Sequence, residues 1–246
     1  MSENKTIRLD LAVADKLCVS RTIAKDIIQK GHVKIDGIVV LKSGVKVDAA
    51  HEIVIEGNLQ SFVSRGGFKL QAAIEEFGLD LNGLVCMDVG ASSGGFSDCM
   101  LQNGAKRVYA VDSGTDQLKD ELKRNCSIIS MEKTDIRKLD PNTLEKMNFI
   151  SVDVSFISLE KILEHVYSFL SENGSAVLLV KPQFEAGIGA VGKRGIVRNP
   201  KTRCKVLDKV YNYAKEVGFV CRGHIESPIK GGDGNVEFLM YVERMA

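Results

Sequence analysis

Long apolar runs are absent from this sequence of 246 residues. No stretch approaches the roughly 18 consecutive apolar residues of a membrane-spanning helix, so we expect no such helix. The first six residues are polar and lack the apolar core of a signal peptide. The hydrophobic fraction of 44% and the lack of a long polar tract are typical of a globular protein.

Disulfide and metal-binding patterns are also missing. The six cysteines are scattered without a C-x-x-C pair, and the four histidines are isolated from one another. This usage indicates reduced thiols in a cytoplasmic protein, and it predicts no metal site.

Two common nucleotide-binding patterns are missing from the most informative stretch, residues 88–101 (D-V-G-A-S-S-G-G-F-S-D-C-M-L). It follows an apolar run and reads as a strand, a glycine turn and a helix, where backbone N–H groups meet nucleotide-like ligands. The turn is not G-x-G-x-x-G, and Phe96 stands where a phosphate loop has its lysine. An adenosine ligand without phosphates therefore fits better, and S-adenosyl-L-methionine is the commonest such cofactor. The alternative is a plain tight turn between a strand and a helix.

Charge is nearly balanced overall, at +1, but is unevenly distributed. Residues 5–34 hold seven Lys or Arg against three Asp, and residues 186–207 hold six Lys or Arg and no acid. Two basic stretches on a nearly neutral protein favour a polyanionic partner held along the surface. A solvated charged face is the alternative for each.

The first sixty residues predict two short helices, a hairpin at Asp36-Gly37 and a further strand at residues 52–56. Ser20 is a suitable N-cap for the second helix. Arg21 and Lys25 are four residues apart on this helix, so both side chains can face one phosphate backbone.

Strands alternate with helices from residue 65 onward, which indicates a mainly parallel sheet. Three predicted strands end in a polar residue, at the edge where such folds build their sites: Asp112, Asp153 and Lys181. A fourth predicted strand, residues 127–131, is followed by Asp135. Asp112 is placed to accept the hydroxyls of a ribose and Asp135 to reach an adenine amine, although either could instead cap a helix. Two more polar residues could lie at the same site as Asp153 and Lys181. Lys69 is in a predicted loop before a helix at residues 70–77, and Glu237 is at the start of an apolar strand. A buried carboxylate at Glu237 needs a cationic partner.

The N-terminal pattern R-L-D … S-R-x-x-A … I-x-x-G-x-V-x-I-D-G … V-x-K resembles the small RNA-binding domain of ribosomal protein "S-four". The motifs S-R-G-G-x-K-L, D-V-G-A-S-S-G-G-F, D-V-S-F-I-S and V-K-P-Q-F-E resemble the FtsJ type of ribose 2′-O-methyltransferase. The whole chain is similar to the TlyA (hemolysin A) family of ribosomal RNA methyltransferases. The expected domains are residues 1–58, a linker at 59–64 and residues 65–246.

This resemblance implies an α/β, Rossmann-like S-adenosylmethionine-dependent methyltransferase fold behind a small α+β RNA-binding domain. It implies S-adenosyl-L-methionine as cofactor, ribosomal RNA or ribosomal subunits as partner, and methylation of a ribose 2′-hydroxyl, with cytidine favoured. The implied catalytic residues are Lys69, Asp153, Lys181 and Glu237. The implied cofactor-binding residues are Gly90, Ser92, Gly94, Gly95, Phe96, Asp112 and Asp135. The implied RNA-binding residues are Arg8, Arg21, Lys25, Arg65, Lys193 and Arg194.

Three other functions fit the sequence less well. A membrane-active hemolysin would need a spanning segment or a long basic amphipathic helix, and this sequence has neither. A non-catalytic ribosome assembly factor would not need the four implied catalytic residues. A base methyltransferase usually carries an Asn-Pro-Pro-Tyr run or a cysteine nucleophile, and neither is present. An ordinary lysine is protonated at pH 7, so the sequence leaves open whether Lys181 deprotonates the hydroxyl or steers it by a hydrogen bond.

Overall fold

The computed structural model describes residues 6–17, 21–56, 62–187, 191–192 and 195–246. The chain divides into two compact units, residues 1–65 and 66–246. Because residues 57–61 lie outside the described part, the expected boundaries at 58 and 64 stay a prediction.

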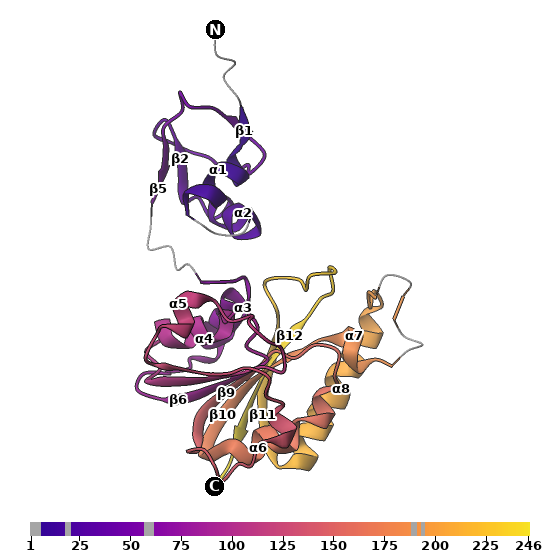
Figure 1. Ribbon diagram of the computed structural model, residues 1–246. Helices are drawn as coiled ribbons and strands as arrows, with labels where there is room; N and C mark the ends of the chain where they lie inside the picture. Colours follow the sequence, from indigo (N-terminus) through magenta and orange to yellow (C-terminus); the bar gives the residue numbers. More distant parts are fainter. Residues whose placement is uncertain (1–5, 18–20, 57–61, 188–190, 193–194) are drawn as a thin grey trace. The chain divides into compact units, whose positions relative to one another are not determined.

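The first unit combines two helices with short strands (Figure 1). Its elements are β1 (Ile7–Arg8), α1 (Leu9–Lys16), α2 (Arg21–Gln29), β2 (Val33–Ile35), β3 (Ile38–Val39), β4 (Lys46–Val47) and β5 (Ile53–Ile55). Strands β3, β2 and β5 form one antiparallel sheet, and β1 pairs with β4. The predicted hairpin is present between β2 and β3. Its turn residues, Asp36 and Gly37, both have positive φ, as a tight turn between twisted strands requires. The predicted cap at Ser20 lies outside the described residues.

The second unit is built on a seven-stranded sheet in the order β11-β12-β10-β9-β6-β7-β8. The strands are β6 (Val85–Val89), β7 (Arg107–Val111), β8 (Ile128–Met131), β9 (Met147–Val152), β10 (Leu170–Val180), β11 (Phe219–Glu226) and β12 (Phe238–Arg244). Strand β12 is antiparallel to both of its neighbours, and the pairs from β8 to β10 are parallel. The predicted mainly parallel α/β sheet is therefore confirmed.

Helices lie along the sheet in two groups (Figure 1). They are α3 (Gly66–Phe77), α4 (Gly95–Gln102), α5 (Asp120–Lys123), α6 (Leu163–Phe169), α7 (Pro182–Glu185) and α8 (Pro200–Val217), with 3₁₀ turns η1 (Ile136–Lys138) and η2 (Leu159–Lys161). Helices α3 and α4 pack against each other, as do α6 and α8. The buried core on the strands is mostly Val, Ile, Leu, Met and Phe, as expected for a sheet covered on both faces.

Two expectations about helices were wrong. Helix α3 begins at Gly66, so Lys69 lies in its first turn rather than in a loop. Glycine is tolerated there because the first N–H groups of a helix have no partner within it. The apolar pattern also predicts one continuous helix over residues 159–170, but the structure divides this segment into η2 and α6, and Leu170 already begins β10.

Candidate active site

Two lysine–carboxylate pairs lie at the carboxyl end of the parallel strands. Lys181 Nζ is 2.6 Å from Asp153 Oδ1, and Lys69 Nζ is 2.5 Å from Glu237 Oε2. Asp153 directly follows β9 and Lys181 directly follows β10, while Glu237 directly precedes β12. Since Val180 pairs with Phe238 in the antiparallel register, Lys181 and Glu237 leave adjacent strands at the same edge. The structure thus brings all four predicted catalytic residues to one edge of the sheet.

Burial makes these pairs chemically significant. Lys69, Lys181 and Glu237 are buried, and Asp153 is largely so. A buried charge is costly unless it is paired, and removing one partner leaves the other uncompensated. Each lysine here has its own carboxylate.

Lys181 makes a second polar contact that sequence reasoning missed. Its Nζ donates a hydrogen bond to Ser155 Oγ at 2.9 Å, and it lies 5.9 Å from the centre of the Phe184 ring. Ser155 belongs to the D-V-S-F-I-S motif, two residues after Asp153, and this spacing was the available signal. Among the described residues, Lys181 therefore has an ion pair with Asp153 and a hydrogen bond to Ser155.

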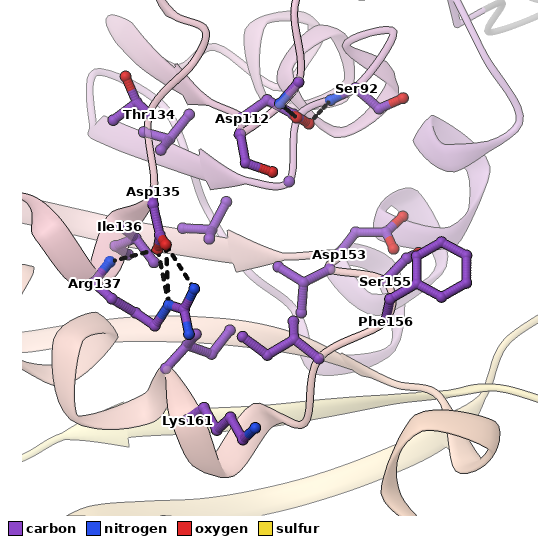
Figure 2. A pocket seen from close by; sticks show the side chains of 18 of the residues that line it. Ser92, Asp112, Thr134, Asp135, Ile136, Arg137, Asp153, Ser155, Phe156 and Lys161 are labelled. Atoms are coloured by element: carbon purple, nitrogen blue, oxygen red, sulfur yellow. Dashed lines mark hydrogen bonds and ion pairs between the residues drawn. The ribbon is translucent and has the colours of Figure 1, made fainter.

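A cavity of about 670 Å³ opens next to the Lys181–Asp153 pair, at the ends of β6, β7 and β9 (Figure 2). Its size is within the range typical of small-molecule sites. Five predicted site residues line it: Gly90, Ser92, Asp112, Asp135 and Asp153. Asp153 therefore belongs both to the cavity wall and to the pair with Lys181.

Asp112 is held rigidly at the cavity wall. Its Oδ2 accepts a hydrogen bond from the Ser92 backbone N–H at 2.7 Å, and its Oδ1 accepts one from the Gly114 backbone N–H at 2.7 Å. Each carboxylate oxygen can accept more than one hydrogen bond, so both stay able to accept from a ligand hydroxyl. Figure 2 shows this carboxylate beside Ser92.

Asp135 caps the turn η1 and pairs with a cavity-lining arginine. Its Oδ1 accepts the Arg137 backbone N–H at 3.0 Å, and its Oδ2 lies 2.6 Å from Arg137 Nη2. The hydrogen bond from the Arg137 side chain holds the pKa of Asp135 below its ordinary 3.8. The capping alternative for Asp135 is thus present in the structure. Arg137 was missed because nothing in the sequence distinguishes it from a surface arginine.

The glycine turn has two parts with different surroundings. Gly90 has a φ of +87°, and a Cβ there would collide with the Asp153 carbonyl group. Gly94 has a φ of +92°, and a Cβ there would collide with Leu122. Gly94, Gly95 and Phe96 are buried and are not part of the cavity lining, so their direct contact with a cofactor stays a prediction.

Asp88 lies beneath the glycine turn and does not reach the cavity. It is fully buried on β6, and its carboxylate accepts hydrogen bonds from Ser97 Oγ at 2.7 Å and Ser151 Oγ at 3.0 Å. Burial raises the pKa of Asp88 to about 7 despite both hydroxyls. The two serines therefore tie β6 to α4 and β9 under the site.

Phe156 is an exposed aromatic residue at the cavity wall. Its side chain is 92% exposed, its φ is +64°, and its ring centre is 5.1 Å from that of Phe184. A bulky residue with positive φ is a conformational outlier of the kind that clusters at functional sites. Phe156 belongs to the motif D-V-S-F-I-S, but the sequence alone assigned it no role.

Glu185 connects the two loops that carry the Lys181–Asp153 pair. Its buried carboxylate accepts hydrogen bonds from Ser158 Oγ at 2.6 Å and the Leu159 backbone N–H at 2.8 Å. Burial raises the pKa of Glu185 above its ordinary value. Helix α7, which follows Lys181, is thereby fixed to the segment that follows Asp153.

The predicted RNA-binding residues are only partly described. Arg8 and Arg21 both contact the buried Asp10, while Lys25 is half-buried on α2. Arg65 is half-buried directly before α3. Lys193 and Arg194 lie outside the described residues.

Across the described residues, no helix is both long and apolar enough to cross a membrane. The same residues contain no cluster of three or more His, Cys, Asp or Glu placed to hold a metal ion.

Comparison with known proteins agrees with this architecture. Residues 62–244 match the FtsJ-like methyltransferase family, and residues 7–53 match the S4 domain. A solved S-adenosylmethionine-dependent methyltransferase from Listeria monocytogenes has the same fold, with a TM-score of 0.55 at 14% identity over 74% of this chain and 99% of its own. The second unit thus has the Rossmann-like fold of these methyltransferases, and the family match makes the chain an FtsJ-like methyltransferase. More narrowly, the chain belongs to the TlyA (hemolysin A) family of FtsJ-like methyltransferases.

Several relatives cover nearly the whole chain. YqxC of Bacillus subtilis, provisionally named an rRNA methyltransferase, is 41% identical over 97% of this chain and 86% of its own length. TlyA of Mycobacterium tuberculosis, a 16S/23S rRNA (cytidine-2′-O)-methyltransferase, is 36% identical over 92% of this chain and 85% of its own. A solved structure from Streptococcus thermophilus, provisionally named a hemolysin, has a TM-score of 0.74 at 42% identity over 98% of this chain and 90% of its own.

Proposed function

We propose that this protein transfers a methyl group from S-adenosyl-L-methionine to the 2′-hydroxyl of a ribose, that of a cytidine, in ribosomal RNA. One observation carries the proposal: Asp153 lines the cavity and is also the partner of Lys181. A cofactor in the cavity and a hydroxyl at Lys181 would therefore be neighbours. Ribosomal RNA is a cytoplasmic substrate, so the reaction would take place in the cytoplasm.

The residues of the cavity fit the cofactor. Asp112 offers two fixed carboxylate oxygens at the end of β7, where nucleotide folds bind a ribose. Asp135 and Ile136 lie at the neighbouring strand end, in reach of an adenine ring. The carboxylates of Asp112, Asp135 and Asp153 also suit a ligand that carries a sulfonium cation. When bound, the cofactor supplies an electrophilic methyl group.

The catalytic pairs suit a hydroxyl nucleophile. As the 2′-oxygen attacks, its proton must be lost and negative charge must be stabilised. The Lys181 ammonium donates to Ser155 and forms an ion pair with Asp153, and it would donate another N–H to the 2′-oxygen. Asp153 would fix the orientation of Lys181. This geometry favours hydrogen-bond steering of the hydroxyl by Lys181 over proton abstraction by Lys181, and the hydroxyl proton would pass to water as the methyl group is transferred.

Lys69 and Glu237 would form the other side of the substrate position. Glu237 holds the Lys69 ammonium at the same sheet edge, where it can orient the target ribose or neutralise its oxygen. The exposed ring of Phe156 offers a stacking surface for an unpaired base, which is how single-stranded RNA is commonly held. The first unit would bind RNA through Arg8, Arg21 and Lys25, by contacts to phosphates.

The deciding experiment is methylation of purified ribosomal subunits with a labelled cofactor. After complete nuclease digestion, mass spectrometry should find 2′-O-methylcytidine, and Lys181→Ala should form it far more slowly. A label found on a base, or equal labelling by wild type and Lys181→Ala, would contradict the proposed reaction.

A further inference from the structure

Asp10 is a buried carboxylate shared by two arginines on the surface of the first unit. Its Oδ1 accepts a hydrogen bond from Arg8 Nε at 3.0 Å, and its Oδ2 accepts one from Arg8 Nη2 at 3.0 Å. The same Oδ2 accepts a third from Arg21 Nε, also at 3.0 Å. Because two arginines meet at one oxygen, their guanidinium groups are adjacent.

The two arginines keep much of their surface open to solvent. Asp10 is fully buried, whereas the side chains of Arg8 and Arg21 are 44% and 48% exposed. Arg8 uses one edge of its guanidinium on Asp10, and Arg21 uses only Nε, so Nη1 of Arg8 and both Nη atoms of Arg21 are not engaged by Asp10. A fixed guanidinium with a free edge is well suited to phosphate oxygens.

Backbone hydrogen bonds hold Leu9 and Asp10 against the segment at residues 43–45. Asp10 belongs to the first turn of α1, and its N–H donates to the Ser43 carbonyl, while Leu9 N–H donates to the Val45 carbonyl. Between them, Gly44 packs against Arg8: a Cβ at Gly44 would lie 3.2 Å from Arg8 Nη2. The segment carrying Ser43 to Val45 therefore limits where the Arg8 guanidinium can go.

Electrostatics make Asp10 necessary for the arrangement. The hydrogen bond from Arg8, together with that from Arg21, lowers the pKa of Asp10 to about 2, so the carboxylate stays ionised at neutral pH. Two adjacent guanidinium cations repel each other, and the anion between them offsets this repulsion. Without that anion, each arginine would return to the many rotamers of a free side chain.

We propose that Asp10 is a positioning residue that holds Arg8 and Arg21 as one preformed guanidinium clamp for the phosphates of an RNA strand. The inference rests on the proposed function, which makes RNA the partner. It adds that an acidic residue in a basic surface strengthens RNA binding, because the two arginines are ordered before the RNA arrives.

This role predicts a change in RNA affinity opposite to the one expected from charge alone. Replacing an acid by a neutral residue makes the surface more positive, and general electrostatics then predicts tighter RNA binding. If Asp10 orders the clamp, Asp10→Asn should instead bind RNA about tenfold more weakly, because two side chains must be ordered on binding.

The test compares Asp10→Asn with a charge-matched control, Asp26→Asn, in the full-length protein. Asp26 is on α2, is 47% exposed and pairs with Lys30 at 3.0 Å, so its loss changes the charge equally without touching the clamp. The probe is ribosomal RNA freed of ribosomal proteins, and affinity is measured over a range of salt concentrations. We expect weaker binding for Asp10→Asn, and equal or tighter binding for Asp26→Asn.

The outcomes separate the inference from the proposed function. If wild type neither binds nor methylates ribosomal RNA, the proposed function is contradicted. If wild type does both and Asp10→Asn binds as tightly as Asp26→Asn, only the role of Asp10 is contradicted. Hydrogen exchange of the α1 and α2 amides establishes whether Asp10→Asn keeps its fold.

A second variant decides the matter if Asp10→Asn unfolds the unit. Arg8→Lys with Arg21→Lys keeps Asp10 and both positive charges, but lysine lacks the planar fork that contacts two oxygens at once. We expect this variant to lose about tenfold in RNA affinity at unchanged net charge. Wild-type affinity would show that charge alone suffices and would overturn the clamp.

Discussion

Lys181 and Asp153 meet at 2.6 Å on adjacent strand ends, and the same Asp153 lines the neighbouring cavity. One carboxylate thus connects the lysine proposed to act on the substrate hydroxyl with the pocket proposed for the methyl donor. The connection has a chemical consequence: disturbing Lys181 should affect methyl transfer far more than cofactor binding.

Lys181→Ala is expected to lower kcat by about 10²–10⁴-fold, the range for losing a positioned proton-transfer or oxyanion-stabilising group. Cofactor affinity should change little, because Lys181 itself is not part of the cavity lining. Single-turnover methylation and calorimetric titration of S-adenosylhomocysteine measure the two effects. Lys209→Ala is the matched control, since Lys209 pairs with Glu160 on the surface. Normal turnover by Lys181→Ala would remove Lys181 from the mechanism.

Glu237→Gln is expected to destabilise the second unit by about 3–5 kcal/mol, because it leaves the buried Lys69 ammonium without its carboxylate. Adding Lys69→Met should restore much of that stability, since the pair is then replaced by neutral groups. Methylation activity should be lost in Glu237→Gln and should not return in the double variant. Urea unfolding and methylation assays follow the two properties. Activity in the double variant would mean that the pair is only structural.

Asp88→Asn should change how stability depends on pH. The pKa of Asp88 is raised from 3.8 to about 7 in the folded state, so between these values the folded chain binds more protons than the unfolded chain. Its contribution to the free energy of unfolding is therefore complete below pH 4 and falls as pH rises toward 7, by about 4 kcal/mol at most.

Subtracting the urea-unfolding profile of Asp88→Asn from that of wild type isolates this effect. The difference should decline from pH 4 to pH 7. A difference that is flat, or that increases over this range, would contradict the raised pKa. Acids with lowered pKa values, such as Asp135 and Glu243, act in the opposite direction but cancel in the subtraction.

Asp112→Asn should weaken cofactor binding about tenfold, because an amide presents one acceptor oxygen to the ribose hydroxyls instead of two. The same substitution should have a smaller effect on a 2′-deoxyribose analogue of S-adenosylhomocysteine. Calorimetric titrations of both ligands against both proteins complete the cycle. Equal losses for the two ligands would place the role of Asp112 in holding Ser92 and Gly114 rather than in contacting the ribose.

Phe156→Ala should weaken RNA binding without unfolding the protein. The ring is 92% exposed, so the free energy of unfolding should change by less than about 0.5 kcal/mol. Stacking on one base is worth about 1–3 kcal/mol, or roughly 5- to 150-fold in affinity for RNA. Phe156→Tyr, which keeps a ring, should behave like wild type. Equal KM values for Phe156→Ala and wild type would exclude stacking.

The central strands β6, β7, β9 and β10 were predictable because their apolar runs are mostly buried in the sheet. The polar residues that follow the parallel strands, Asp112, Asp135, Asp153 and Lys181, were predictable because parallel strands share one carboxyl edge. Which lysine pairs with which carboxylate was not predictable. Nothing in the sequence assigns Lys69 to Glu237 or Lys181 to Asp153. The first pair depends on the place of β12 beside β10, and the second on the place of β10 beside β9.

Short elements and shared partners were also beyond sequence reasoning. Helices α5 and α7 have four residues each, too few to show a helical period. Arg8 and Arg21 were expected to bind RNA because they are basic. Their common partner Asp10 emerged only from the packing of α1 against α2, because tertiary contacts decide which acid a surface arginine meets.

The place of β12 imposes an order on biosynthesis. This strand fills the gap between β10 and β11, and Glu237 directly precedes it. During synthesis, the edge of β10 stays unpaired and Lys69 lacks its partner until Glu237 and β12 have been made. The Lys69–Glu237 pair is therefore completed later than the Lys181–Asp153 pair, whose two residues both precede β12 in the chain.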